Sequence, residues 1–360
     1  MRVHQLGHGL IPGDAISHHT LEIDRRLRAW GLESHIFAGH VASEYQALAQ
    51  TDGHFHSFLD SPDDLLIYHY SIYDPNYRLF QKTLMRKILI YHNITPPQFF
   101  QGWDRSLAAL CDAGRRVLVE LRGCDLALGD SDFNRRELVA AGIPEEKTDV
   151  LSIFLPQSHF TPATDPDLMT QLQAQGTVKF LTVGRVVPNK AIEDVIRIFA
   201  LYHRAINPRS CLYVVGSRYL PAYDTALDEL VDELALNDAV VFTGLVSDTA
   251  LKTYYQAADL YLHASHHEGF CVPLIESMYF GLPILARKAA AVPETLGDAG
   301  VLFTRLGYKK VAEMAHLLVS DESLKAQVIA RQRQRLQDFA HDRVEAKLRE
   351  ILIRLHVLPA

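Results

Sequence analysis

Two glutamates, Glu268 and Glu276, lie in the segment HEGFCVPLIESMYFGLP and could bind hydroxyl groups. Pro273 suits the first turn of a helix, and Gly269 lets the backbone N–H groups of Gly269 and Phe270 face a ligand. Free N–H groups at a helix N-terminus favour phosphate, and carboxylates accept hydrogen bonds from sugar hydroxyls. The segment therefore predicts a sugar-phosphate site, and the structural alternative is a glutamate that only complements the helix dipole.

Two cations, Arg185 and Lys190, lie in the segment GRVVPNK. This segment follows an apolar strand expected at Val178–Val183, and a helix is expected to begin just after it. Arginine offers a two-point fork and lysine a point charge, a combination that suits an anionic diphosphate. Exposed cations in loops are common, so these two residues support a diphosphate site only together with the glutamate segment.

In the N-terminal half, His92 ends the apolar run Lys87–His92. A strand-end residue of a parallel sheet points into the crevice where α/β folds bind ligands, so His92 is a candidate catalytic residue, with a purely structural role as the equal alternative. The turn at Gly13 and Asp14 and the helix start at Ser131 are candidates for loops that touch donor or acceptor. An ordinary tight turn and an N-cap are their structural alternatives.

Other signatures in this half do not predict a cofactor or a metal. The segment GHGLIPG has the spacing GxGxxxG with Pro12 inside it, and the second strand ends in FAGH without the acidic residue that would hold a nicotinamide ribose. Asp130 and Asp132 imitate a metal-binding DxD pair, but they stand where a strand becomes a helix, so capping and the helix dipole explain them. We expect no cofactor and no metal.

Composition narrows the class of protein. The chain has 360 residues, 48% of them apolar and 22% charged, with a net charge of −7, which predicts a globular enzyme and no nucleic-acid partner. Four scattered cysteines without a CxxC pair argue for a reducing cytosol and against both disulfides and a zinc site. No apolar run reaches the ~18–20 residues of a membrane span. The expected location is cytoplasmic, with at most peripheral contact at the inner face of the membrane through clustered arginines, for which solvated helix faces are the favoured alternative.

Short apolar strands alternate with amphipathic helical stretches, which predicts an α/β fold with parallel sheets. A proline-rich polar stretch around residues 155–170 is the expected linker between two such series, and residues 323–355 are expected to be helical. The predicted strands of the first series are Met1–Leu6, Ser34–Ala38, Leu65–Tyr68, Lys87–His92 and Leu126–Gly129. Those of the second series are Val178–Val183, Cys211–Val215, Val240–Thr243, Leu260–His263, Pro283–Ala286 and Gly300–Phe303.

Taken together, the ordered segments of the second half resemble family 4 of the retaining GT-B glycosyltransferases, which use nucleotide-sugar donors. The first half matches loosely, through its early glycine segment, His92 and the Ser131 helix. The segments that carry the resemblance are Val183–Arg185, Asn189–Lys190, Phe242–Ser247, Tyr254–Asp259, Ser265–Phe270, Leu274–Glu276, Gly281–Ile284 and Pro293–Glu294.

The resemblance implies two facing Rossmann-like domains with an interdomain cleft. They would be an acceptor-binding domain at residues 1–155 and a nucleotide-sugar-binding domain at 156–335, with a C-terminal helix at 336–360 packing back on the first. It also implies that Arg185 and Lys190 bind the donor diphosphate, Glu268 and His92 approach the transferred sugar, and Glu276 holds the ribose. Transfer would be metal-independent and would retain anomeric configuration.

The chain departs from the family at two places. Cys271 stands where the family usually has glycine, which bears on the approach to the sugar and on donor choice. The Asn-Gly that usually precedes the linker is absent, since the chain reads LSIFLP.

The expected function is transfer of a hexose-type sugar from a nucleoside-diphosphate donor to a carbohydrate or lipid-linked acceptor. Bacterial polysaccharide or glycolipid synthesis is the expected setting, and GDP-mannose is the first choice of donor. The alternatives are a sugar-nucleotide 2-epimerase of the same fold, which would turn over the donor with no acceptor present, and an inactive binding subunit.

Overall fold

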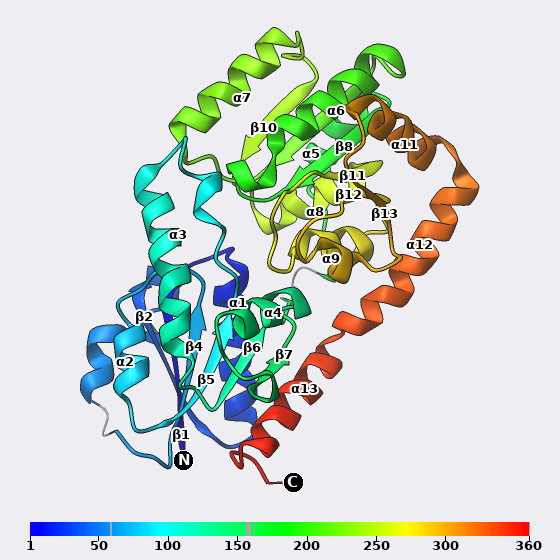
Figure 1. The fold of residues 1–360 in the computed structure, drawn as a ribbon. Helices are drawn as coiled ribbons and strands as arrows, with labels where there is room; N and C mark the ends of the chain where they lie inside the picture. The colour runs from blue at the N-terminus through cyan, green and yellow to red at the C-terminus, as the bar shows by residue number, and fades with distance from the viewer. Residues whose placement is uncertain (58–59, 156–159, 162, 360) are drawn as a thin grey trace. The chain divides into compact units, whose positions relative to one another are not determined.

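The computed structural model describes residues 1–57, 60–155, 160–161 and 163–359, which form two compact units (Figure 1). The first unit comprises Met1–Gln98, Arg105–Pro156 and Phe339–Ala360, and the second comprises Phe99–Asp104 and Gln157–Asp338. The short segment Phe99–Asp104 thus belongs to the second unit, although it lies inside the range expected for the first. Within the described residues, no helix combines the length and the apolar character that crossing a bilayer requires.

The first unit is built on a seven-stranded sheet in the order β3-β2-β1-β4-β5-β6-β7, with every neighbouring pair parallel. The five strands expected here are confirmed, whereas β3 and β7, of three residues each, were not predicted. The strands are β1 Arg2–Leu10, β2 Glu33–Val41, β3 Ala49–Thr51, β4 Leu65–Tyr70, β5 Arg86–Tyr91, β6 Leu126–Gly129 and β7 Thr148–Val150.

Helices flank this sheet and close its core. Helix α1 begins where the Asp14 side chain accepts a hydrogen bond from the Ser17 backbone N–H at 2.9 Å, and it buries Ile23 and Leu27 against the strands. The helices of the unit are α1 Ala15–Ala29, α2 Tyr77–Lys82, α3 Arg105–Val117, α4 Asp132–Ala140 and α13 His341–Arg354.

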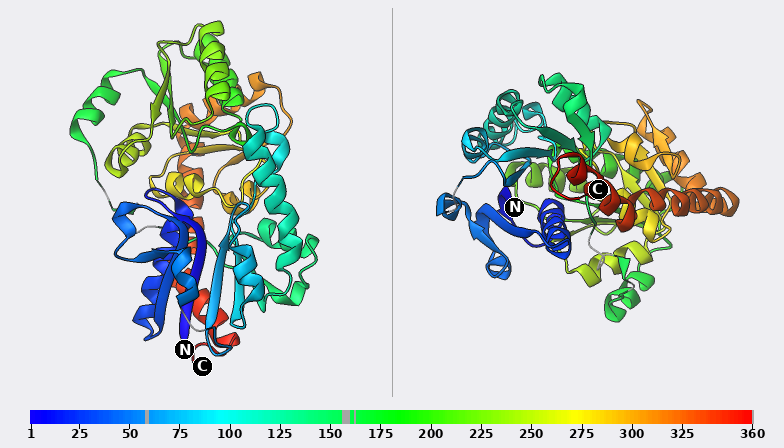
Figure 2. Two further views of the ribbon diagram at one scale, coloured as in Figure 1. Left: turned by 90° about the vertical axis from the view of Figure 1, so that its left-hand side faces the viewer. Right: turned by 90° about the horizontal axis from the view of Figure 1, so that it is seen from below.

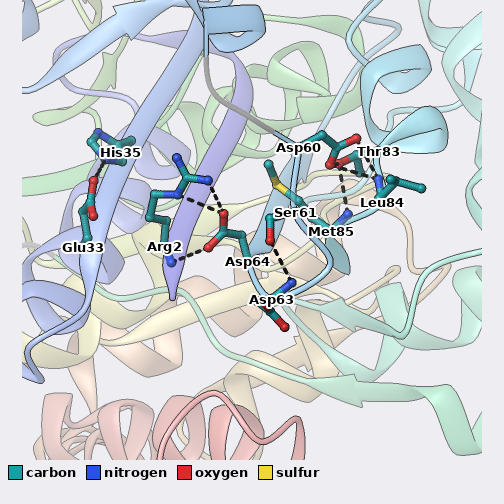
Figure 3. Close-up of polar contacts among 10 residues, drawn as sticks. All are labelled: Arg2, Glu33, His35, Asp60, Ser61, Asp63, Asp64, Thr83, Leu84 and Met85. Carbon is teal, nitrogen blue, oxygen red and sulfur yellow. Dashed lines mark hydrogen bonds and ion pairs between the residues drawn. The ribbon is translucent and has the colours of Figure 1, made fainter.

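The amino-terminal edge of the first sheet is tied by polar contacts (Figure 3). Arg2 donates through Nη2 to Asp64 Oδ2 at 2.6 Å, and its backbone N–H donates to Asp64 Oδ1 at 2.7 Å. Asp60 accepts from the Thr83 hydroxyl at 2.7 Å and from the Leu84 N–H at 2.9 Å. These contacts join the segments that lead into β1, β4 and β5, at the edge opposite to the carboxyl ends of the strands, where α/β sheets bind ligands.

The second unit carries a six-stranded sheet in the order β10-β9-β8-β11-β12-β13, again parallel throughout. All six strands predicted for this half are confirmed, with small shifts at their ends. They are β8 Val178–Val183, β9 Ser210–Val215, β10 Val240–Gly244, β11 Leu260–His263, β12 Ile284–Arg287 and β13 Val301–Phe303. The helices are α5 Pro166–Ala174, α6 Ile192–Ala205, α7 Pro221–Glu233, α8 Asp248–Ala257, α9 Val272–Tyr279, α10 Val292–Leu296, α11 Tyr308–Ser320 and α12 Glu322–Leu336.

Two local predictions were wrong. Helix α5 begins inside the expected linker, because Asp165 caps it by accepting from the Leu168 N–H at 3.1 Å and Pro166 suits its first turn. Residues 156–159 and 162 of that linker lie outside the described residues. Strand β1 continues to Leu10, so Gly7 and Gly9 lie within the strand rather than in a loop after it.

The helical C-terminal stretch is divided between the two units. Helix α12 ends at Leu336, and the short turn Gln337–Phe339 separates it from α13. Helix α13 and the residues after it belong to the core of the first unit, where both ends of the chain lie (Figure 2). The buried apolar residues from this segment are Val344, Leu348, Ile351, Leu352, Val357 and Leu358.

Candidate functional site

The second sheet reverses its strand order between β8 and β11, and the predicted donor residues gather at the carboxyl ends of these two strands. Arg185 and Lys190 follow β8, while Glu268 follows β11 and leads into α9. In doubly wound α/β sheets, ligands bind at such a reversal because the two loops diverge there. The sheet order thus places the predicted cations and the first predicted carboxylate at one location.

Lys190 and Glu268 are in direct contact. The Lys190 ammonium donates to Glu268 Oε1 at 2.6 Å and to Oε2 at 2.7 Å, and the Glu268 side chain is only 7% exposed. Burial alone would raise the pKa of Glu268, but the charge of Lys190 and a hydrogen bond with His263 lower it well below its usual range. Glu268 is therefore a carboxylate at neutral pH, held as a hydrogen-bond acceptor.

Hydrogen bonds to backbone groups hold the loop after β8 and the loop after β11 together. Asn189 donates through Nδ2 to the His267 carbonyl at 3.1 Å, and the His266 N–H donates to the Asn189 carbonyl at 2.8 Å. Gly216 follows the neighbouring strand β9 and must be glycine. A Cβ at this position would lie 1.9 Å from the carbonyl oxygen of Gly184, in the loop after β8. The position of Lys190 is thus fixed by the neighbouring strands as well as by Glu268.

A small pocket opens beside this pair. Arg185 is exposed at its rim, and among the residues that the structure describes no carboxylate pairs with it. The pocket is lined by Thr182, Val183, Gly184, Arg185, Lys190, Ile192, Val214, His263 and Ser265. Two cations at one pocket make an anion-binding region, in keeping with the predicted diphosphate role.

Gly269 and Phe270 lie directly before α9, as the sequence predicted. The Phe270 ring is buried, and its carbonyl accepts from the Thr295 hydroxyl at 2.5 Å. Cys271 is the N-cap of the helix and has a φ of +73°, yet its side chain makes no capping hydrogen bond. The backbone therefore turns sharply into α9 at Cys271, and the Cys271 side chain accepts no hydrogen bond from the N–H groups of the first helical turn.

Glu276 lies in the second turn of α9 and is 5% exposed. The Tyr255 hydroxyl donates to Glu276 Oε2 at 2.8 Å, and burial followed by the Glu276 charge raises the pKa of that tyrosine well above its usual range. The two glutamates thus have different partners. The role of Glu276 at the ribose stays a prediction.

His92 does not point into an open crevice as expected, since its side chain is 1% exposed. Its Nδ1 lies 2.9 Å from Asp130 Oδ2, and its Nε2 lies 3.0 Å from His69 Nδ1. The far nitrogen of His69 lies 3.0 Å from Gln5 Oε1, so four buried side chains form one chain of hydrogen bonds. Strand β5 carries His92 to the expected sheet edge, but neighbouring polar groups draw the ring inward.

The remaining candidates of the first unit have local structural roles. Gly13 supplies the positive φ of +73° in the turn before α1, and Asp14 caps that helix. Ser131 is the predicted N-cap of α4 and accepts from the Asn134 N–H at 3.2 Å. Asp132 pairs with the guanidinium of Arg135 at 2.6 Å. Capping and ion pairing thus account for these residues, and their contact with a donor or acceptor stays a prediction.

Comparison with known proteins identifies the second unit. Residues 167–335 match the family model described as glycosyl transferases group 1. Residues 167–335 form a group 1 glycosyltransferase domain. The group 1 domain contains both cations and both glutamates of the predicted site.

The chain also resembles curated proteins. It is 26% identical over 247 residues to the O-antigen chain mannosyltransferase B of Escherichia coli, an alignment that covers 65% of this chain and 61% of that protein. It is 29% identical over 174 residues to mannosylfructose-phosphate synthase of Agrobacterium fabrum, covering 46% of this chain and 38% of that protein. The chain thus spans about three fifths, or less, of the length of these relatives.

Solved structures extend the likeness to the whole chain. Anabaena HepE in complex with UDP-glucose superimposes with a TM-score of 0.75 at 19% identity, covering 98% of this chain and all of that one. Sucrose-phosphate synthase from Thermosynechococcus elongatus gives a TM-score of 0.76 at 17% identity and 99% coverage of both chains. Together with the two parallel sheets, these likenesses confirm the GT-B fold for the chain that contains the group 1 domain.

The sequence did not single out three side chains that shape the group 1 domain's site. His263 Nε2 lies 3.3 Å from Glu268 Oε1, Asn189 joins the two loops, and Tyr255 holds Glu276. His263 could have been found, because it ends an apolar strand as His92 does. The amide of Asn189 and the hydroxyl of Tyr255 carried no such signal, since their partners are distant in sequence.

Proposed function

We propose that this protein transfers a hexose-type sugar from a nucleoside-diphosphate donor to a carbohydrate or lipid-linked acceptor. The observation that carries the proposal is the Lys190–Glu268 pair at the strand-order reversal of the group 1 domain, with Arg185 beside it. Two cations suit the diphosphate of a donor, and a buried carboxylate suits its sugar hydroxyls. The match to the group 1 family and the named relatives support the same reaction class.

The electrostatics of the Lys190–Glu268 pair support separate tasks for the two residues. Because the pKa of Glu268 is lowered, this carboxylate has no proton to donate at neutral pH and serves as an acceptor for sugar hydroxyls. Lys190 and Arg185 offset the negative charge that grows on the diphosphate as the glycosidic bond breaks. The N-terminus of α9 adds backbone donors on the same side of the sheet.

We further propose GDP-mannose as the donor and bacterial polysaccharide or glycolipid synthesis as the setting. Relatives named as a mannosyltransferase and as a mannosylfructose-phosphate synthase support mannose. Likenesses solved with UDP or UDP-glucose make a uridine donor the competing choice. We also propose that the transfer retains the anomeric configuration of the sugar and that the protein binds peripherally to the membrane.

The proposal predicts transfer from GDP-mannose to an added glycan acceptor, at nearly full rate in excess EDTA, because two cations bind the diphosphate without a metal. Product formation from GDP-mannose and from UDP-glucose, each with and without acceptor, is the measurement. Turnover of the nucleotide sugar without acceptor would favour the epimerase. Loss of transfer in EDTA, restored by Mg²⁺ or Mn²⁺, would contradict metal independence.

A second prediction separates the two glutamates. Glu276→Ala should weaken free GDP and GDP-mannose alike, by roughly ten- to a hundredfold, since a hydrogen bond to a charged group contributes about 1.5–3 kcal/mol. Glu268→Ala should leave GDP affinity nearly unchanged and lower the transfer rate, because its partner is the reacting sugar. Calorimetry with GDP and a transfer assay on both variants make the comparison. Equal loss of GDP affinity in both variants would mean that the roles are misassigned.

A further inference from the structure

Three side chains of different chemistry converge beside the proposed sugar site. His263 ends β11, while Glu268 and Cys271 lie in the loop that leads into α9. His263 Nε2 lies 3.3 Å from Glu268 Oε1 and 3.6 Å from Cys271 Sγ, and the three ligand atoms all lie within 4.8 Å of one another. All three residues are more than nine-tenths buried.

We propose that His263, Glu268 and Cys271 form a binding site for a thiophilic divalent cation such as Zn²⁺, and that the bound ion inhibits sugar transfer. Ion binding stands independently of the proposed function, whereas inhibition rests on it. Nitrogen, oxygen and sulfur donors are the ligands that zinc takes in proteins. The absence of paired cysteines argued against zinc at the level of sequence, but one thiol suffices when the fold adds an imidazole and a carboxylate.

The distances suit such an ion. Bonds of about 2.0–2.3 Å in tetrahedral geometry place neighbouring donor atoms roughly 3.3–3.7 Å apart. Both distances from His263 Nε2 fall in that range, so the imidazole already has ligand spacing from both partners. The ligand atoms of Glu268 and Cys271 lie within 4.8 Å of each other and need at most to close to the same range. Three protein ligands leave the fourth position for water or another ligand.

The backbone at Cys271 supports a role for its side chain. Its φ of +73° is a conformation that glycine adopts freely and that a residue with a Cβ adopts at a cost. The thiol does not offset this cost by capping α9, and its Sγ lies instead 3.6 Å from His263 Nε2. Strained residues of this kind collect at binding sites.

Ion binding changes the electrostatics of the pair. Burial, followed by the charge of Glu268, raises the pKa of the Cys271 thiol well above its usual range, so binding must release the thiol proton to solvent. Glu268 Oε1 lies 2.6 Å from Lys190 Nζ and 3.3 Å from His263 Nε2. Coordination of the ion by this oxygen would break its hydrogen bond with Lys190. A carboxylate bound to the ion is withdrawn from the sugar hydroxyls, which is why we expect inhibition.

Titration with Co²⁺ tests the site directly, because a cobalt–thiolate bond gives a charge-transfer absorption band. The full chain should show the band at one equivalent, and Cys271→Gly should abolish it. Glycine adopts the required backbone conformation without strain, so this variant should keep its fold. Cys211→Ser, which removes a half-buried thiol of β9 that is not a ligand here, should keep the band.

His263→Gln supplies a second ligand deletion and should weaken Zn²⁺, measured by competition with a chelator, at least about tenfold. No band in the full chain, or a band that persists in Cys271→Gly, would overturn the proposal. In transfer assays, Zn²⁺ should inhibit the natural chain and spare Cys271→Gly, each compared with its own rate. If no transfer is detected at all, the cobalt band still decides the ion site, and the failure falls on the proposed function.

Discussion

Deletion of the chain from Val344 onward is expected to unfold the first unit rather than to remove a free tail. Four buried side chains of α13, at Val344, Leu348, Ile351 and Leu352, belong to the core of that unit. Burying an aliphatic side chain contributes about 1.5–3 kcal/mol, so the four together contribute about 6–12 kcal/mol. That is comparable to the whole stability of a typical domain, about 5–15 kcal/mol.

Single substitutions in α13 test the same prediction one side chain at a time. Ile351→Ala should lower the free energy of unfolding by about 2–5 kcal/mol, while Arg349→Ala on the exposed side of the same helix should change it by less than about 0.5 kcal/mol. Thermal melting of the two variants and of the deletion is the measurement. A deletion that melts like the natural chain would show that α13 is dispensable.

Lys190→Ala and Arg185→Ala should both weaken GDP binding, by roughly ten- to a hundredfold each, because each removes one charge-assisted contact to the diphosphate. Only Lys190→Ala should also destabilise the second unit. It leaves the Glu268 carboxylate buried without its cation, and breaking a buried pair costs about 3–5 kcal/mol. Because Lys190 itself is 19% exposed, we expect the lower end, or a melting temperature reduced by roughly 6–12 °C.

A double variant isolates the cause. Adding Glu268→Gln to Lys190→Ala removes the uncompensated charge and should restore much of the lost stability. Acid should do the same. The folded-state pKa of Glu268 is lowered, so the pair's stabilisation is complete above about pH 4.5 and is lost as pH falls through the lowered value. In Lys190→Ala the buried Glu268 has lost the cation that lowers its pKa, so it takes up a proton at a higher pH than in the natural chain. The difference in melting temperature between natural chain and variant should therefore shrink from pH 7 to pH 4, because the variant loses its uncompensated charge while the natural chain keeps its ion pair, and a constant difference would contradict the ion-pair account.

The fold was largely readable because apolar runs carry the strand signal. Runs such as Val178–Val183 are buried on both faces and stand out from their polar neighbours. Strands β3 and β7 could not be read in this way, since three residues are too few to show a pattern. Helix α5 was missed because its capping residues, Asp165 and Pro166, also occur in linkers.

The site was predicted as residue types, and only partly as contacts. Lys190 and Glu268 are 78 residues apart, and they meet because β8 and β11 are neighbours in the sheet. Apolar patterning specifies strands but not which strands are neighbours in the sheet, so the sequence could not predict the Lys190–Glu268 ion pair. The sequence could not predict the burial of the His92 ring for the same reason, since its partners His69 and Asp130 lie on or beside the two strands that flank β5.

The buried chain from Gln5 to Asp130 fixes where its protons lie. Gln5 donates through Nε2 to the Thr20 carbonyl, so its Oε1 must accept from His69 Nε2. Burial lowers the pKa of His69, which is therefore neutral, and its bare Nδ1 accepts from His92 Nε2. One proton remains between His92 and Asp130, and their combined charge is zero whichever of them holds it.

The positions of these protons limit the hydrogen bonds that His92 can make to a ligand. Both of its ring nitrogens are already committed, one to His69 and one to Asp130. A sugar hydroxyl can bond to a ring nitrogen of His92 only after the contact with His69 or the contact with Asp130 breaks, and loss of the first leaves the bare nitrogen of His69 without a donor. Engagement of His92 through Nε2 is therefore coupled to a rearrangement that extends through His69 to Gln5 on β1.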